Sequence, residues 1–489
     1  AFETGLNRRT HNDLITAEKL SALAAKLDPD KGFRYPAEEI RETYDLSMLY
    51  DEHTWGAWSS IDEPWTAFSR GQWALKSSFA YIANETPQTL IKRGLTALGR
   101  LISADGDFEF AVFNPLSWDR TDVVRVMLPA GPLRDAKGNF RVIDRRSGSD
   151  AKFQPDGDEA ILIVARDIPS LGYAVFGIEL AKGQSSVGPA APGAPASSPA
   201  APSAAKPAPA GKTIENRFYR VTVDPATGGI TSLFDKELAR ELVDSSCPYP
   251  LNTYIYEQPE GGRKAVDDME KRAVFHRWMP ESAKLETGRQ GPASLSLVVK
   301  SSAKMCPTLE QRIILYDDVK RIDLNNILHK EATFNPEAVY FAFPFDVGPG
   351  FAEGAGKMGK VLASLNVKTG MRGPNVRFEI SDGDMVPETE QLPGTTRDWE
   401  TVQHWVEFAG RNARVVWSPV EAPLVEFGDI NTGKWLKRLD ITNAWVFSYA
   451  MNNYWMTNFK ASQDGIIEFN YSLTSGPAAG GPDRVAASR

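Results

Sequence analysis

The stretch YDEHTWGAW, residues 50–58, places a histidine between two carboxylates and a Trp-Gly step. His53 is one of only five histidines in 489 residues. Its imidazole could bind a divalent metal, but such a site needs three or four ligands. Asp51 and Glu52 do not supply them, because adjacent helical residues point in different directions. Taken alone, His53 is more simply a helix-end histidine hydrogen-bonded to a neighbour, and both interpretations stay open.

The tripeptide His11-Asn12-Asp13 offers a second candidate metal site. A His-x-Asp pair can supply two metal ligands when it ends a strand. Here the preceding residues GLNRRT are not an apolar strand, and a helical pattern follows. We therefore interpret Asn12 and Asp13 as polar residues that precede a helix, and we reject the metal interpretation.

Two later segments concentrate aromatic and polar residues: QLPGTTRDWETVQHWVEF, with Gln391 and Arg397, and NNYWMTNFKASQDG, with Asn453. Sugars stack on planar aromatic faces, while amides and charged groups bind their hydroxyls. The three named residues are therefore candidates for binding a sugar. The alternative is a β-sandwich core with Asn-rich turns, and the sequence does not decide between them.

Composition excludes several classes of function. The 63 acidic and 55 basic residues give a net charge of −8 without a concentrated basic run, so nucleic acid and anionic membranes are not expected partners. No apolar stretch approaches the roughly 20 residues of a membrane helix, so we expect a soluble protein, either cytoplasmic or exported. Cys247 and Cys306 fit no metal or redox spacing. Phosphate-loop, Rossmann and GxSxG motifs are lacking.

The first hundred residues follow a helical period. Helices are predicted near 16–27 with Thr16 as N-cap, near 36–53, near 63–83, and near 86–102 with Thr86 as cap and Pro87 at the first position. Short breaks between them indicate an antiparallel bundle. The third predicted helix carries a bundle seam with residues three and four apart, namely Trp65, Phe68, Gln72, Leu75, Phe79 and Ile82.

Alternating strands follow from about residue 107. Between 188 and 211, 17 of 24 residues are Ala or Pro, which predicts an extended, solvated spacer. We predict an α+β multidomain chain: a helical bundle with the end of a catalytic region (1–104), a small β-sandwich (105–182), an Ala/Pro-rich linker (183–212) and a large antiparallel β supersandwich (213–489).

Several segments together resemble the zinc-dependent α-mannosidases of glycoside hydrolase family 38, in that family's order. They are HNDLITAEKLSALA, LYDEHTWGAW, FNPLSWDRTDVV, NRFYRVTVDPATGGITSLFDKELARELVD, AVYFAFPFDV, LPGTTRDWETVQHW, APLVEFGD and NNYWMTNFKASQ. The resemblance implies that this chain is the C-terminal portion and that a catalytic α/β barrel is missing from its N-terminal side. The terminal residues, Ala1 and the closing GGPDRVAASR, also lead us to expect a piece of a longer protein.

The resemblance also implies a role for His53. It matches the family's later zinc ligand, so Zn²⁺ is the expected cofactor and this chain supplies one ligand. Thr54, where family members often have a sugar-binding Asp, and Trp55 become candidate substrate contacts. The nucleophile and the acid/base group of retaining hydrolysis are expected in the barrel, so the chain alone should be inactive. The expected partners are an α-mannoside oligosaccharide, the barrel and, in some members, a second copy of the enzyme. The alternative is a non-catalytic carbohydrate-binding or scaffolding protein.

Overall fold

The structure is a computed structural model of the chain. It describes residues 1–27, 32–54, 56–103, 106–180, 212–268, 270–351, 375–455 and 458–480. The chain divides into two compact units. The small unit is Ser103–Ala210 with Gly291–Ala293, and the large unit is Ala1–Ile102, Gly211–Gln290 and Ser294–Arg489. Most of the predicted Ala/Pro linker lies outside the described residues.

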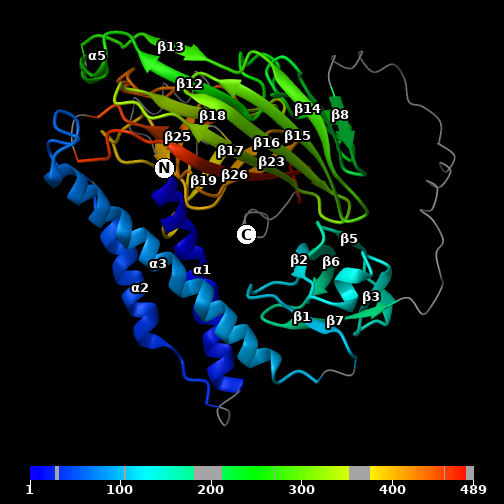
Figure 1. The fold of residues 1–489 in the computed structure, drawn as a ribbon. Coiled ribbons are helices and arrows are strands. Elements are labelled where there is room, and N and C mark those ends of the chain that lie inside the picture. Colours follow the sequence, from blue (N-terminus) through cyan, green and yellow to red (C-terminus); the bar gives the residue numbers. More distant parts are fainter. Residues whose placement is uncertain are drawn as a thin grey trace. The chain divides into compact units, whose positions relative to one another are not determined.

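Three long helices open the large unit and lie side by side (Figure 1). They are α1 (Phe2–Leu27), α2 (Ala37–Asp51) and α3 (Ala67–Gly99). No helix of the described ranges has the length and apolarity that a membrane crossing requires.

The helix boundaries differ from the prediction at two places. Thr16 is not an N-cap, because α1 already begins at Phe2 and the Thr16 hydroxyl donates to the Asn12 carbonyl at 3.3 Å. The helix extends that far because its first half buries small and polar side chains such as Asn7 and Thr10, which hydropathy does not mark as a core face.

The predicted break at Thr86 and Pro87 is also wrong. Pro87 lies buried inside the continuous helix α3, although proline removes one helical hydrogen bond. Both halves of α3 place small or apolar residues toward the bundle, so packing outweighs the lost bond. The buried positions include Ala80, Ala83, Leu90 and Ala97.

The predicted seam of α3 is largely not buried. Phe68, Leu75 and Ile82 expose 54%, 54% and 56% of their surface. The face that packs against α1 and α2 instead carries Ser69 and Lys76 among its members. A regular apolar stripe therefore remains on the outside of α3 within the described structure.

The small unit is a β-sandwich of two antiparallel sheets, ordered β1-β7-β3-β4 and β2-β6-β5. Its core joins residues of both sheets, for example Phe140 and Ile163. The elements are β1 (Glu109–Phe113), β2 (Arg120–Met127), α4 (Pro132–Asp135), β3 (Phe140–Asp144), β4 (Ser149–Asp150), β5 (Phe153–Pro155), β6 (Ala160–Ile168) and β7 (Tyr173–Leu180).

The rest of the large unit is an antiparallel supersandwich of three sheets. The four-stranded sheet, in the order β11-β10-β9-β8, contains β8 (Lys212–Glu215), β9 (Tyr219–Val223), β10 (Ile230–Asp235) and β11 (Arg240–Glu241). The six-stranded sheet, in the order β13-β12-β18-β25-β24-β21, contains β12 (Thr253–Pro259), β13 (Phe275–Trp278), β18 (Ala338–Phe345), β21 (Glu400–Thr401), β24 (Leu424–Phe427) and β25 (Ala444–Asn452).

The nine-stranded sheet has the order β14-β15-β16-β17-β26-β23-β22-β19-β20. Its strands are β14 (Ala283–Gln290), β15 (Ser294–Ala303), β16 (Cys306–Tyr316), β17 (Ile322–Lys330), β19 (Val376–Ile380), β20 (Gly383–Met385), β22 (Val406–Ala409), β23 (Arg414–Pro419) and β26 (Gly465–Gly476). A short helix, α5 (Arg263–Asp267), follows β12. The predicted fold class, a helical part followed by antiparallel β-sandwiches, is confirmed.

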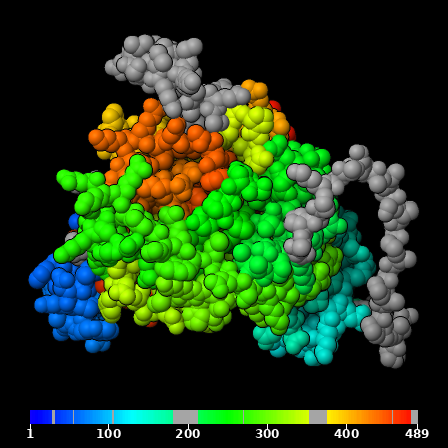
Figure 2. All heavy atoms as spheres, turned by 90° about the horizontal axis from the view of Figure 1, so that it is seen from above, coloured from blue at the N-terminus to red at the C-terminus, as the bar shows by residue number. Residues whose placement is uncertain are grey.

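The main core lies between the six- and nine-stranded sheets. Phe343 of β18 contacts Trp417 of β23 and Tyr471 of β26, with ring centroids 4.9 and 4.8 Å apart. Every residue of β18 is buried, as its uninterrupted apolar sequence AVYFAFPF requires. The other face of the six-stranded sheet packs under loops, where the Trp435 indole donates to the Val266 carbonyl at 3.0 Å. In Figure 2 these orange and green segments lie side by side.

Polar contacts join the helices to the supersandwich in one compact unit. Arg8 of α1 donates to the carbonyls of Val420, at 3.1 Å, and Gln403, at 2.5 Å. Burial lowers the pKa of Arg8 to about 10. Arg9 pairs with the buried Glu421 at 2.9 Å. These contacts fix the start of α1 against the segments that follow β21 and β23. Cys247 and Cys306, whose pairing the sequence leaves open, are free thiols.

Candidate functional site

His53 lies just beyond the last turn of α2, with a side chain that is 86% exposed. Its Nδ1 is 2.7 Å from Oε1 of Glu52. A carboxylate at this distance accepts a hydrogen bond from Nδ1–H, which leaves the lone pair on Nε2. The nearest polar neighbour of Nε2 is the Thr54 hydroxyl, at 3.5 Å. Metal-binding histidines commonly donate their second nitrogen to a carboxylate in this way, and the partner fixes the ring orientation.

Thr54 holds this carboxylate in place. Its backbone N–H and its hydroxyl donate to the two oxygens of Glu52, each at 3.0 Å. The backbone hydrogen bond from Thr54 is the first cause of a lowered pKa at Glu52. Glu52 is therefore an anion suited to accept from His53. Thr54 serves this turn, whereas its neighbour Trp55 lies outside the described residues.

His53 borders a cavity of about 730 Å³ in the large unit. The cavity lies between the start of α1, the middle of α3 and the segment that joins β25 to β26. Its remaining lining residues are Ala1, Phe2, Glu3, Thr4, Tyr81, Asn452, Trp455, Asn458, Phe459, Lys460, Gln463, Asp464, Ile466 and Ile467. Aromatic rings, amides and charges of both signs thus surround one open space, a combination that suits a polyhydroxylated ligand.

Zinc fits only in part. The donor chemistry of His53 is suitable, because an oriented imidazole is a common zinc ligand. Among the described residues, however, no three His, Cys, Asp or Glu side chains come together as a metal site. The His11 imidazole pairs with the Asp51 carboxylate at 3.0 Å. Asn12 and Asp13, which were predicted to precede a helix, lie inside α1. The described part of the chain therefore offers one candidate ligand, His53.

Gln391 and Arg397 do not line this cavity. The Gln391 amide donates to Glu400 at 2.6 Å and accepts from the Glu388 backbone at 2.8 Å. Arg397 is buried and pairs with Glu388 at 2.7 Å. Both residues thus bind protein groups in the turn before β21 and stabilise that turn.

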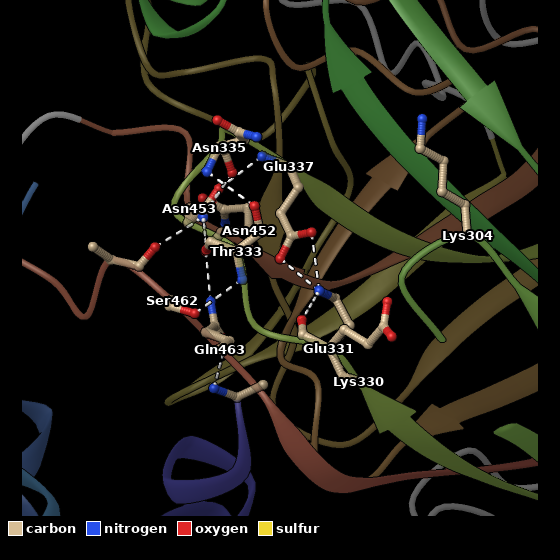
Figure 3. Close-up of polar contacts among 12 residues, drawn as sticks. Lys304, Lys330, Glu331, Thr333, Asn335, Glu337, Asn452, Asn453, Ser462 and Gln463 are labelled. Carbon is tan, nitrogen blue, oxygen red and sulfur yellow. Dashed lines mark hydrogen bonds and ion pairs between the residues drawn. The ribbon is translucent and has the colours of Figure 1, made fainter. Parts of the chain in front are cut away.

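Asn453 is close to the cavity but faces the protein interior (Figure 3). Its amide nitrogen donates to the carbonyls of Asn335 and Ala461 at 3.0 and 2.9 Å, and more weakly to that of Thr333 at 3.4 Å. Its amide oxygen accepts from the Glu337 backbone at 2.7 Å. With its donors and acceptors engaged, Asn453 ties the start of the β25–β26 connection to the turn before β18.

Figure 3 also shows how the end of that connection is held. The Ser462 hydroxyl accepts from the Thr333 backbone at 3.1 Å, and the Gln463 amide donates to the Asn452 carbonyl at 2.6 Å. Beneath them Lys330 and Glu337 form a buried ion pair at 2.8 Å. These contacts fix the segment that presents Lys460 and Asp464 to the cavity.

Sequence reasoning found part of this lining. The segment NNYWMTNFKASQDG includes the cavity residues Asn452, Trp455 and Asn458, although the residue chosen from it, Asn453, points inward. Tyr81 was missed, because a tyrosine beside the apolar stripe of a helix carries no signal of its own. The convergence of α1, α3 and this segment is tertiary, and no local pattern encodes it.

A separate group of buried or half-buried carboxyls lies outside the cavity. Burial raises the pKa of Glu426 to about 8, of Glu400 to about 7 and of Asp398 to about 6. Glu426 accepts from the hydroxyls of Thr432 and Tyr340 at 2.7 and 3.1 Å. These groups stand under the loops that cover the six-stranded sheet, and their contacts are structural.

The chain is similar to known proteins in sequence profile and in fold. The family profile described as glycosyl hydrolases family 38 C-terminal domain matches residues 214–358. A family 38 protein from Enterococcus faecalis has a TM-score of 0.59 at 13% identity, covering 98% of this chain and 56% of that one. An α-mannosidase from Enterococcus faecalis V583 has a TM-score of 0.57 at 12% identity, covering 98% and 54%. No curated protein sequence matches the chain.

The resemblance that the sequence indicated is thereby confirmed. Residues 214–358 match the C-terminal domain of glycosyl hydrolase family 38, and nearly the whole chain shares its fold with part of the two Enterococcus faecalis proteins. The chain spans about half the length of each of these structures.

Proposed function

We propose that this chain is the C-terminal portion of a zinc-dependent, retaining α-mannosidase that hydrolyses terminal α-mannosides of oligosaccharides. The observation that carries the proposal is the geometry at His53. An exposed imidazole, oriented by an ionised Glu52, stands at the rim of a polar and aromatic cavity in a chain with a family 38 C-terminal domain.

In this proposal an N-terminal catalytic barrel supplies the remaining zinc ligands, the nucleophile and the acid/base carboxyl. Retaining hydrolysis uses two carboxyl groups about 5 Å apart, one attacking the anomeric carbon and one protonating the leaving oxygen. Bound zinc would orient sugar hydroxyls and stabilise charge in the transition state. This chain contributes His53 as a ligand, with Thr54 holding its carboxylate partner and Trp55 nearby in sequence.

The exposed apolar stripe of α3 supports the proposal that a further domain packs against this helix. Exposed side chains spaced seven residues apart, Phe68, Leu75 and Ile82, have the spacing of a helix that packs against another surface. Tyr81, beside this stripe, also lines the His53 cavity. A barrel that completes the zinc site at His53 must therefore approach α3, where it can cover the stripe.

A second function is favoured by the cavity itself. Trp455, Tyr81 and Asn452 offer ring faces and an amide to a sugar without any catalytic group. A non-catalytic, carbohydrate-binding protein with mannosidase-like accessory domains would need no more. Calorimetry of the 489-residue chain with mannose and mannobiose tests this alternative, and heat of binding at millimolar sugar would support it.

The test of the main proposal is turnover of an aryl α-mannoside. The intact polypeptide, with its N-terminal part, should hydrolyse the substrate, lose activity on dialysis against a chelator and regain it with Zn²⁺. The 489-residue chain at the same concentration should show none. Turnover by this chain alone, or chelator-insensitive turnover by the intact polypeptide, contradicts the proposal.

A further inference from the structure

Lys76 of α3 is buried, with only 5% of its surface exposed, yet its ammonium group does not lie in a carboxylate cluster. Its Nζ donates to two backbone carbonyls at the end of α2, those of Leu49 at 2.7 Å and Glu52 at 2.6 Å. The Glu52 carboxylate lies farther off, at 3.4 Å. The last carbonyls of a helix lack partners within the helix, and a cation there also interacts favourably with the helix dipole.

The opposite side of the α2 end is held by α1. Asp51 accepts from the Asn7 amide at 2.8 Å and pairs with His11 at 3.0 Å. The Tyr50 hydroxyl lies 2.9 Å from that of Thr4. The backbone that leads into His53 is therefore clamped between two helices, although the imidazole itself is exposed.

The chain after His53 is clamped as well. A Cβ atom on Gly56 would lie 2.8 Å from the carbonyl oxygen of Phe459. Only glycine permits this close approach of the turn to the segment that carries Phe459 and Lys460. The glycine at position 56 thus has a physical reason, namely its close backbone contact with the cavity wall.

We propose that Lys76 is a positioning residue that fixes the end of α2, so that His53 presents Nε2 to the cavity from one defined place. Gly56 serves the same purpose from the other side of the turn. The inference rests on the proposed function only where it names zinc as the metal that Nε2 binds. The clamp itself is a property of this chain.

The first test uses the 489-residue chain. Lys76→Met keeps the aliphatic stem and removes the three donors. Amide hydrogen exchange of residues 49–54 should accelerate about tenfold or more, since a hydrogen bond from a charged group contributes that much to local stability. With histidine labelled by ¹³C at Cε1, the His53 signal should shift or broaden while signals remote from α2 stay in place. Lys76→Arg should restore part of both readouts, and Lys92→Met, an exposed lysine of the same helix, should change neither.

Gly56→Ala provides a second variant in case Lys76→Met does not fold. It disturbs the same turn without uncovering buried carbonyls at α2, and it should also displace the His53 signal. If residues 49–54 exchange at the native rate and the His53 signal is unmoved in every folded variant, the clamp does not position His53 and the inference is overturned.

The second test measures zinc affinity in the intact polypeptide by competition with a chelator. Loss of an outer partner of a metal ligand typically weakens metal binding about 10- to 100-fold, and Lys76→Met should fall in that range. Weakening by His53→Ala but not by Lys76→Met refutes the positioning role and leaves the proposed function standing. If His53→Ala itself leaves zinc binding intact, the proposed function fails, and the exchange and histidine measurements alone decide whether the clamp exists.

Discussion

At the scale of single residues, the structure separates two uses of polar groups that look alike in sequence. His53 and Asn453 both sit in polar, aromatic segments. His53 is exposed with one nitrogen directed by Glu52, whereas Asn453 is buried and bonded throughout. The residue type shows which ligands a side chain can bind. The surrounding residues decide whether its hydrogen-bonding groups are already engaged within the protein.

The hydrogen bonds of the Asn453 side chain lead to a prediction about stability. Asn453→Ala removes four hydrogen bonds and leaves buried carbonyls and the Glu337 N–H without their partner, so the free energy of unfolding should fall by about 3 kcal/mol. Asn335→Ala, an exposed asparagine of the same turn, should change it by less than about 0.5 kcal/mol. Urea unfolding of the 489-residue chain measures both. Equal effects would show that Asn453 does not hold the connection.

Glu426 yields a prediction about pH. Burial raises its pKa in the folded protein to about 8 from an ordinary 4.5, so the folded state binds more protons than the unfolded state between these values. Stability therefore falls as pH rises through that window, by at most about 1.4 kcal/mol per pH unit from this group. Glu257, which repels Glu426 and pairs with Arg277 at 2.5 Å, also has a raised pKa and acts in the same direction.

Glu426→Gln isolates this contribution. Unfolding free energies at pH 5.5 and 7.5 should differ by about 1–2 kcal/mol less in the variant than in the native chain. An unchanged difference between the two pH values would mean that Glu426 is already ionised in the folded protein.

At the scale of elements, α3 combines two faces that the sequence did not separate. Its bundle face is built of small residues, Lys76 and Pro87, while its most regular apolar stripe faces outward. Periodicity located the apolar stripe correctly but placed it on the face that packs against the neighbouring helices. The spacing shows that one face of a helix is apolar, and it does not show what covers that face.

The stripe can be tested without enzymology. Leu75→Glu with Ile82→Glu should leave the unfolding free energy of the 489-residue chain within about 0.5 kcal/mol per site, since both side chains are half exposed there. In the intact polypeptide the same pair should lower the thermal midpoint clearly, because a covered interface would bury unpaired charge. Lys92→Glu on the same helix is the control. Equal midpoints for native and stripe variants of the intact polypeptide would remove the stripe as support for a barrel contact.

At the scale of the whole molecule, the sequence predicted the order of helices and antiparallel sandwiches and the family resemblance. These follow from period, turn residues and long matching segments such as NRFYRVTVD, which forms β9 and its turn. It did not predict that α1 belongs to one compact unit with the supersandwich. That union depends on Arg8 and Arg9 reaching residues about four hundred positions away.

The candidate site was predictable in part for the same reason. His53 and the Trp455 segment were marked by composition and by resemblance. The cavity that joins them with Tyr81, the Lys76 clamp and the Gly56 contact depends on distances between remote segments. Such distances arise from packing and leave no local pattern.

The most direct measurement is zinc content and aryl α-mannoside turnover of the intact polypeptide carrying His53→Ala, beside His276→Ala as an exposed-histidine control. Loss of one direct zinc ligand should remove most of the bound zinc and reduce turnover by at least about a hundredfold, while the control keeps both. Full zinc occupancy and a normal rate in His53→Ala would contradict the account, because the imidazole at the end of α2 would then be a structural residue only.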